Sequence, residues 1–190
     1  MPNPSKRDQI IDIALNLFYQ AGFNATGVDK ITSESGVTKK TIYAHFKSKD
    51  ELILATLRRR DELFRNNFMR SVERLGKTPR QRLDAVFDTI DEWFNSKNFS
   101  GCMFINASAE FPKQENPCHI VCAEHKRLMF DYICELSKSA GAKNPAALSE
   151  ELNFLIEGAT VQAHVCGDKK AGMKAKEMAQ LFIEKALNGD

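Results

Sequence analysis

Apolar residues recur along this chain at the spacing of an α-helix. Ile10, Ala14, Leu17 and Phe18 begin the pattern, and their three- and four-residue intervals place side chains on one face of a helix. No stretch alternates apolar and polar residues with the period of two that a half-buried strand shows. The pattern predicts an all-α fold of about nine helices.

Capping residues, glycines and prolines divide this pattern into segments. Thr26 with Asp29 resembles a capping pair and predicts a short helix that starts near Val28 and ends at Gly36. A long helix begins at about residue 48 and meets no glycine or proline before Gly76. The predicted helices cover about 6–21, 28–35, 39–45, 48–75, 79–95, 102–111, 117–141, 148–166 and 173–187.

The long helix predicts how the chain is divided. We expect a small N-terminal domain over residues 1–50, a larger helical domain over residues 51–190, and a stalk over about 48–75 that connects them.

Charge is unevenly divided: residues 1–60 hold 10 basic and 6 acidic side chains, whereas the rest of the chain holds 17 basic and 19 acidic side chains. A basic excess in one part is typical of a module that faces a polyanion.

Hydropathy and cysteine content predict a cytoplasmic protein. The longest apolar run is only four residues, whereas a membrane-spanning helix needs roughly 18 or more, so we expect no membrane association. Lys6 and Arg7 are followed by the polar residues Asp8, Gln9 and Asp12 rather than by the apolar stretch of a secretion signal. Five cysteines without an export signal indicate a reducing compartment in which thiols stay free.

Two short helices joined by a turn at Gly36 describe a helix-turn-helix. Val28, Ile31, Val37 and Ile42 have the spacing to form its small core with Phe18 from the first helix, and glycine accepts the positive φ of a sharp turn. The second helix then exposes hydrogen-bond donors and no acidic residue, namely Thr38, Lys39, Lys40, Thr41, Tyr43 and His45. Such a surface suits phosphates and base edges.

The N-terminal motif resembles the DNA-binding domain of TetR/AcrR-type transcriptional regulators. The resemblance covers about residues 8–55 and is carried by Gly22-Phe23, Thr26, Val28, Ile31, Gly36-Val37-Thr38, Thr41-Ile42-Tyr43, His45-Phe46 and Ser48-Lys49-Asp50-Glu51-Leu52. Gly27 and Thr32 depart from the pattern, where a hydroxyl residue and an alanine are usual. The length and helical pattern of the rest also look like this family, whose C-terminal domain dimerises and binds an effector.

The resemblance implies roles for residues of the N-terminal domain. Thr38, Lys39 and Lys40, at the start of the recognition helix, are candidates for contact with bases and adjacent phosphates, with Thr41 on the same helix. Tyr43 and His45 would bind phosphates, or else pack beside Phe46. Thr26 and Lys49 begin helices, where anions are favoured. Lys6 and Arg7 would reach the DNA backbone or adjacent groove, or form only a solvated tail.

Two apolar stripes in the C-terminal part predict a homodimer. Small residues in the second half of one stripe permit close helix approach, and two neighbouring stripes suit a four-helix interface. The interface residues we expect are Leu152, Leu155, Ile156, Ala159, Ala163, Met178 and Phe182. The alternative is that they pack only against their own domain. A two-fold pair would read two half-sites about 34–36 Å apart on palindromic double-stranded DNA.

The helix after Pro117 is apolar nearly all round, which indicates burial on several faces. With neighbouring segments it is predicted to line a mostly apolar cavity for a small-molecule effector of unknown identity. The expected pocket residues are Trp93, Phe94, Cys102, Met103, Phe104, Asn106, Cys122, His125 and Met129. The alternative interpretation is that these residues form ordinary core.

Cys118, Cys122 and His125 lie at i, i+4 and i+7 near the start of that helix, where a thiolate is favoured. They suggest a zinc site that lacks one ligand or a redox-sensing thiol, against the simpler interpretation as core. We expect no cofactor and no bound metal.

The sequence therefore predicts a ligand-responsive transcriptional regulator, most simply a repressor, that is not an enzyme. The alternatives are a redox-sensing or metal-sensing regulator that uses Cys118, Cys122 and His125, a cysteine-dependent enzyme that uses one of three histidines, and a helical adaptor with a vestigial helix-turn-helix. No nucleophile signature surrounds any cysteine. The histidines of the enzyme alternative are His119, His125 and His164.

Overall fold

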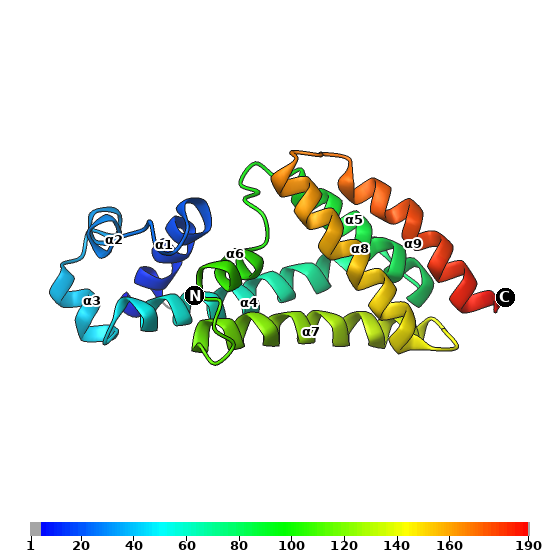
Figure 1. The fold of residues 1–190 in the computed structure, drawn as a ribbon, viewed down its shortest axis with the longest axis horizontal. Helices are drawn as coiled ribbons and strands as arrows, with labels where there is room; N and C mark the ends of the chain where they lie inside the picture. Colours follow the sequence, from blue (N-terminus) through cyan, green and yellow to red (C-terminus); the bar gives the residue numbers. More distant parts are fainter. Residues whose placement is uncertain (1–4, 190) are drawn as a thin grey trace. The chain divides into compact units, whose positions relative to one another are not determined.

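The structure, a computed structural model, describes residues 5–189, which form nine α-helices and no strand (Figure 1). The helices are α1 (Lys6–Ala21), α2 (Val28–Ser35), α3 (Lys39–His45), α4 (Lys49–Leu75), α5 (Pro79–Phe94), α6 (Met103–Glu110), α7 (Pro117–Ser139), α8 (Pro145–Val165) and α9 (Ala171–Asn188). The predicted all-α fold is confirmed. None of the helices in 5–189 combines the length and the apolar composition that crossing a membrane requires.

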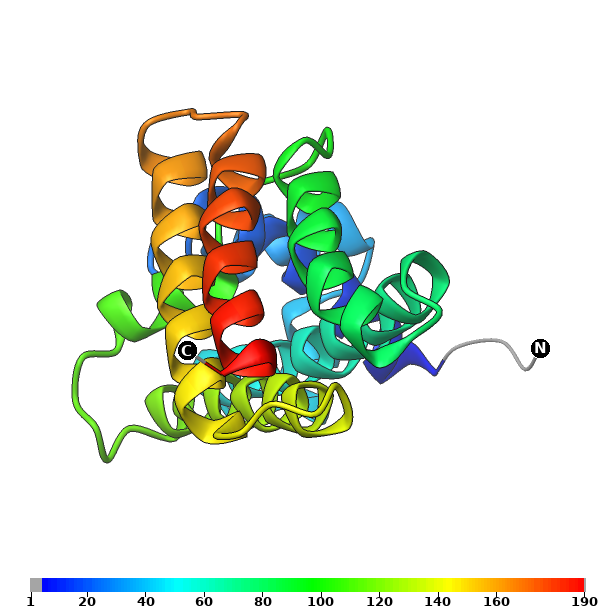
Figure 2. The same ribbon diagram turned by 90° about the vertical axis from the view of Figure 1, so that its right-hand side faces the viewer.

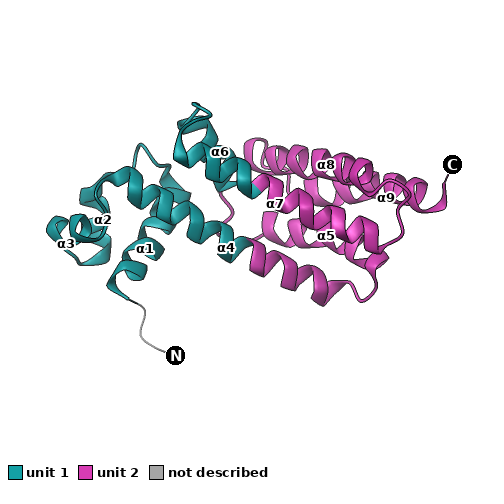
Figure 3. Cartoon of the chain, turned by 90° about the horizontal axis from the view of Figure 1, so that it is seen from below, with its two compact units in different colours: residues 1–64, 102–125 teal, residues 65–101, 126–190 magenta. Residues whose placement is uncertain are grey.

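The described residues form two compact units (Figure 3). Unit 1 contains the residues up to Phe64 together with Cys102–His125, and unit 2 contains Arg65–Gly101 and the residues from Lys126 onward. The boundary falls inside α4 and α7, so each of these helices contributes to both units. The functional division expected at residue 50 stays a prediction.

Unit 1 is built on a core of aromatic and branched side chains. Phe18 of α1 stacks on Phe23 with ring centroids 5.3 Å apart, and both rings are buried. Ile31 of α2 and Ile42 of α3 are buried in the same unit, as their spacing predicted. Val28 and Val37, expected in this core, are only half-buried.

The prediction that Thr26 caps the start of α2 was wrong. Gly27 is the N-cap of α2 and provides no side-chain hydrogen bond. Thr26 is only 2% exposed, and its hydroxyl donates to the carbonyl oxygen of Gly22 at 2.7 Å. A serine or threonine three residues before an acidic residue resembles a capping pair, but here the hydroxyl donates to the carbonyl of Gly22 in the preceding turn.

Unit 2 is a helical bundle in which α9 packs against both α8 and α5 (Figure 2). Helix α5 has a full capping box, in which the Thr78 hydroxyl accepts from the Gln81 N–H and the Gln81 side chain accepts from the Thr78 N–H. Pro79 occupies the first helical position, as predicted. The core of this unit includes Phe87, Leu152 and Ile183.

Candidate nucleic-acid interface

The short helix α3 depends on its surroundings for its position. It has seven residues, fewer than an isolated helix needs, and its inner face is fixed by the buried side chain of Ile42. Gly36 adopts the left-handed conformation, with φ of +65°, at the turn that precedes it. The buried Phe46 follows α3 and donates its N–H to the carbonyl of Ile42 at 2.9 Å. These constraints leave the opposite face of α3 open to solvent.

That open face carries most of the predicted donors. Lys39, Lys40, Tyr43 and His45 are exposed, whereas Thr41 is half-buried. The His45 ring lies 6.4 Å from the ring of Phe46 and remains exposed. Four polar side chains therefore project from one short helix, where they are accessible to a large partner.

Two hydroxyls on this face also stabilise the helix. Thr38 is the N-cap of α3, and its hydroxyl accepts from the N–H of Thr41 at 3.1 Å. The two threonine hydroxyls lie 3.0 Å apart, within hydrogen-bond distance. The Thr38 hydroxyl would therefore have to contact a base or phosphate while it also caps α3.

An acidic side chain that the sequence pattern assigned to helix capping lies beside the recognition helix. Asp29, in the first turn of α2, places its Oδ1 2.6 Å from the Nζ of Lys39. The hydrogen bond to Asp29, followed by its charge, raises the pKa of Lys39 above the usual value, so the ammonium form is favoured. Helix α3 contains no acid, but the surface around it does. No sequence pattern points to this pair, because the turn between the helices brings it together.

The other predicted contacts differ in accessibility. The Thr26 side chain is buried, so its predicted phosphate contact is corrected: the hydroxyl cannot reach a ligand in solvent. Lys49, half-buried at the start of α4, places its ammonium 3.4 Å from the Asn24 carbonyl oxygen. At the start of α1, the Arg7 guanidinium lies over the ring of Phe46 at 5.0 Å, and Lys6 donates to Gln9 at 3.4 Å. Arg7 thus lies against Phe46, whereas Lys6 stays exposed on the first turn of α1.

The predicted effector residues lie in both units. Cys102, Met103, Phe104, Asn106, Cys122 and His125 belong to unit 1, whereas Trp93, Phe94 and Met129 belong to unit 2. In unit 1 the buried His125 ring stacks on Phe104 with centroids 3.7 Å apart and an interplanar angle of 13°. Its Nδ1 lies 2.8 Å from Oδ1 of Asp61, a residue that the sequence analysis missed. The pocket stays a prediction.

Cys118, the first residue of the predicted cysteine and histidine cluster, does not have the properties of a reactive thiol. Burial raises the pKa of Cys118 to about 11, with the Asp50 charge as a smaller cause. Burial thus opposes, at Cys118, the thiolate that the helix start was expected to favour. Residues 5–189 contain no group of three or more His, Cys, Asp or Glu side chains that could hold a metal ion.

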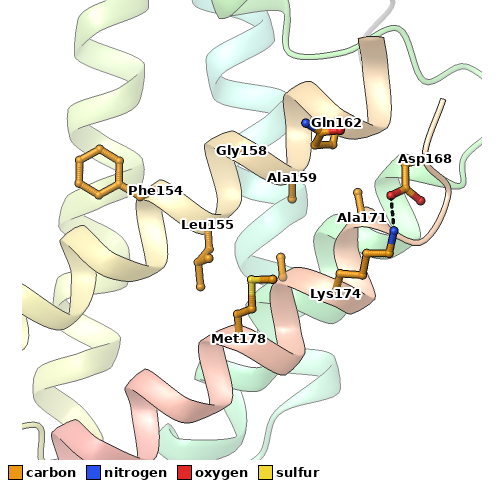
Figure 4. A pocket seen from close by; sticks show the side chains of 10 residues that line it. Phe154, Leu155, Gly158, Ala159, Gln162, Asp168, Ala171, Lys174 and Met178 are labelled. Atoms are coloured by element: carbon orange, nitrogen blue, oxygen red, sulfur yellow. Dashed lines mark hydrogen bonds and ion pairs between the residues drawn. The ribbon is translucent and has the colours of Figure 1, made fainter. Parts of the chain in front are cut away.

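The outward faces of α8 and α9 expose large apolar side chains. Phe154 and Leu181 are 78% and 69% exposed, and Val161, Val165 and Met178 are exposed as well. Between the two helices lies a groove of about 250 Å³ with an apolar lining, and Figure 4 shows Leu155 and Met178 reaching into it. The lining residues are Phe154, Leu155, Gly158, Ala159, Gln162, Asp168, Ala171, Lys174, Ala175 and Met178.

The predicted interface residues only partly coincide with this surface. Met178 is exposed, whereas Leu155 and Phe182 are half-buried and Ile156, Ala159 and Ala163 are nearly covered within their own unit. Leu152 has no exposed surface, so its predicted contact with a second copy is corrected: it belongs to the core of its own unit. Phe154, Val161 and Val165 were missed, although their spacing of seven and four residues places them on one helical face.

Comparison with known proteins finds transcriptional regulators that match the N-terminal motif or most of the chain. The sequence model of "Bacterial regulatory proteins, tetR family" matches residues 10–56. The HTH-type transcriptional activator FasR from Mycolicibacterium smegmatis is 38% identical over 96 residues, which cover 48% of this chain and 43% of that protein, less than half of its length. The HTH-type transcriptional repressor ComR from Escherichia coli is 27% identical over 171 residues, which cover 85% of this chain and 81% of that protein.

A solved structure extends the likeness beyond the N-terminal helices. SCO4454, a TetR-family transcriptional regulator from Streptomyces coelicolor, superposes with a TM-score of 0.88 at 28% identity, and the superposition covers 95% of each chain. The relatives that match are transcriptional regulators rather than enzymes. The N-terminal motif, the nine-helix fold of the described residues and these relatives agree in supporting a TetR/AcrR-type transcriptional regulator.

Proposed function

We propose that this chain is a repressor that binds a palindromic DNA operator as a homodimer and responds to a small-molecule effector. The observation that carries the proposal is the open face of α3, where Lys39, Lys40, Tyr43 and His45 are exposed while Ile42 anchors the opposite side. A helix presented in this way fits the major groove of DNA. The repressor role is supported by the similarity to ComR, a repressor matched over most of its length, whereas FasR, matched over less than half, is an activator.

The basic residues would have two kinds of role in DNA binding. Lys39 and Lys40 lie at the start of α3, where side chains reach base edges, and Lys49 lies at the start of α4, where a phosphate is the natural partner. We expect Lys39→Ala to reduce binding to the operator more than binding to random DNA, and Lys49→Ala to reduce both. Equal losses on both kinds of DNA for Lys39→Ala would contradict direct base readout.

The direct test is a gel-shift assay with DNA fragments from the region beside the coding sequence, followed by footprinting. We expect a protected inverted repeat and an affinity that falls steeply with salt, because neutralised phosphates release counterions. An adaptor or an enzyme would form no site-specific, salt-sensitive complex. No protection on any fragment would overturn the proposal. A regulator of this kind would work in the cytoplasm, where bacterial DNA is located.

The partner in the proposed dimer is a second copy that covers the outward faces of α8 and α9. The exposed Phe154 and Leu181 and the apolar groove beside them support this choice, since large apolar patches on a single subunit mark interaction surfaces. We expect Phe154→Glu to produce a folded monomer with weakened operator binding, measured by light scattering and gel shift. Ile120→Glu, which changes a 54% exposed side chain on α7, is the control and should leave the dimer intact. A Phe154→Glu protein that stays dimeric would rule out this surface.

Effector binding would act by shifting the equilibrium between conformations with different operator affinity. Coupling of about 1–3 kcal/mol changes affinity roughly 5- to 150-fold. The pocket residues proposed in unit 1 include the stacked pair of Phe104 and His125, and the Nδ1 of His125 lies 2.8 Å from Oδ1 of Asp61. Footprinting repeated with candidate metabolites tests the response to an effector. The raised pKa of Cys118 disfavours thiol sensing at that residue.

A further inference from the structure

The ion pair between Asp29 and Lys39 joins two helices of the DNA-binding motif. Asp29 lies in the first turn of α2, and Lys39 is the first residue of α3. Their charged atoms are 2.6 Å apart, and the side chains are 81% and 57% exposed. A carboxylate therefore stands in solvent on the surface that would approach the phosphates of DNA.

This pair changes what Lys39 can contribute to binding. When Lys39 stays on Asp29, the two charges cancel, and the lysine adds little to the electrostatic attraction on which nonspecific binding depends. At the operator, base-edge acceptors lie in register with α3, and the ammonium can exchange its carboxylate partner for them. On an arbitrary sequence no such acceptor is in register, so Lys39 remains paired.

We propose that Asp29 is a specificity-determining residue that holds Lys39 away from phosphates on arbitrary DNA and releases it to base edges at the operator. The inference rests on the proposed function, because it assumes that α3 reads DNA. It adds a residue of α2 that itself needs no contact with a base. Asp29 would act by weakening the wrong complexes more than the right one, which is one of the two ways in which a protein gains specificity.

The variant Asp29→Asn tests the proposal, because it removes the charge and keeps the size of the side chain. Released Lys39 would gain about one phosphate contact on random DNA, which steepens the salt dependence by about 0.9 in log–log slope and strengthens binding by up to about eightfold at 0.1 M salt. Binding to the operator should change less and keep its slope, because Lys39 has already left Asp29 there. The ratio of the two affinities should fall.

A matched control exists on the same helix. Glu34 pairs with Lys30 at 2.7 Å, with both side chains about half exposed, and Glu34→Gln makes the same change in net charge on α2. Glu34→Gln should leave the specificity ratio near the wild-type value. In a Lys39→Ala background, Asp29→Asn should no longer steepen the slope on random DNA, since its effect passes through the lysine.

The measurement is fluorescence anisotropy over about 50–200 mM salt. The two probes are a random-sequence duplex and a duplex enriched by the wild-type protein from a random pool. If wild-type protein enriches no sequence and binds no duplex, the proposed function itself fails. If it enriches a sequence but Asp29→Asn and Glu34→Gln behave alike, the effect is general charge and only this inference is overturned. If Asp29→Asn loses affinity equally for both probes and melts at a lower temperature, the ion pair has a structural role, and this inference is overturned.

Discussion

Replacing Glu110 with alanine should loosen the turn between α1 and α2. Glu110 is the last residue of α6, and its carboxylate accepts two successive backbone N–H groups from that turn. Oε1 accepts from Phe23 at 2.9 Å, and Oε2 accepts from Asn24 at 2.6 Å. All three residues belong to unit 1. One side chain thus holds a turn more than 80 positions earlier in the chain.

The size of the effect follows from the exposure of the two bonds. Hydrogen bonds to a charged group contribute about 1.5–3 kcal/mol each, and less where water can replace the charged partner. The Phe23 bond is partly buried, but the Asn24 bond is exposed, so water can replace the carboxylate at Asn24. We expect Glu110→Ala to destabilise the turn by about 1–2 kcal/mol in total. Glu110→Gln should lie between alanine and wild type, because its amide oxygen still accepts a hydrogen bond.

Hydrogen exchange measures this effect where it occurs. A loss of about 1–2 kcal/mol should speed exchange of the Phe23 and Asn24 amides roughly 5- to 30-fold, at about 1.4 kcal/mol for each factor of ten. Glu115→Ala, which removes the same charge from an exposed position between α6 and α7, is the control. If the turn amides of Glu110→Ala exchange at the rate of the Glu115→Ala protein, the carboxylate does not hold the turn and the reasoning is refuted.

Two further predictions concern unfolding and thiol chemistry. Thr78→Ala removes one half of the capping box of α5 and should lower the free energy of unfolding by about 1 kcal/mol, measured by urea denaturation; an unchanged midpoint would contradict a stabilising cap. The exposed Cys166 should react with iodoacetamide in the folded protein at pH 8, whereas Cys118, whose pKa is raised from 9.0 to about 11, should react only on unfolding. Because the folded state favours the protonated Cys118 thiol, its contribution to stability is complete below pH 9 and is lost between pH 9 and 11. Equal alkylation rates for the two thiols would refute this account.

Local chemistry explains which helix boundaries could be predicted. Gly36 ends α2 in the left-handed conformation that its residue type favours, and Pro79 follows Thr78 at the start of α5 as expected. The apolar pattern predicts a start of α8 near residue 148, but the helix begins at Pro145 after the N-cap Asn144. A capping residue followed by proline marks the start of both α5 and α8.

Contacts between distant residues could not be predicted, because their geometry depends on packing. The pairs Asp29 with Lys39 and His125 with Asp61 join different helices, and neither residue type nor spacing indicates a partner. The apolar stripe of α8 shows a related difficulty. This helix has apolar residues on both its inner and outer faces, and periodicity alone does not say that Leu152 faces the core while Phe154 faces solvent. Which face of α8 is buried depends on how the other helices of the bundle pack against it.

The position of Glu110 bears on how an effector could influence DNA binding. Met103 and Phe104, two of the predicted pocket residues, lie in the first turn of α6, and Glu110 lies at its other end. An eight-residue helix is about 12 Å long, and its backbone hydrogen bonds join each turn to the next. If α6 shifted as a unit, a ligand that displaces Phe104 would also displace the carboxylate that holds Phe23 and Asn24. This route to the DNA-binding helices does not pass through α4, so stiffening α4 alone would not abolish a response that α6 transmits.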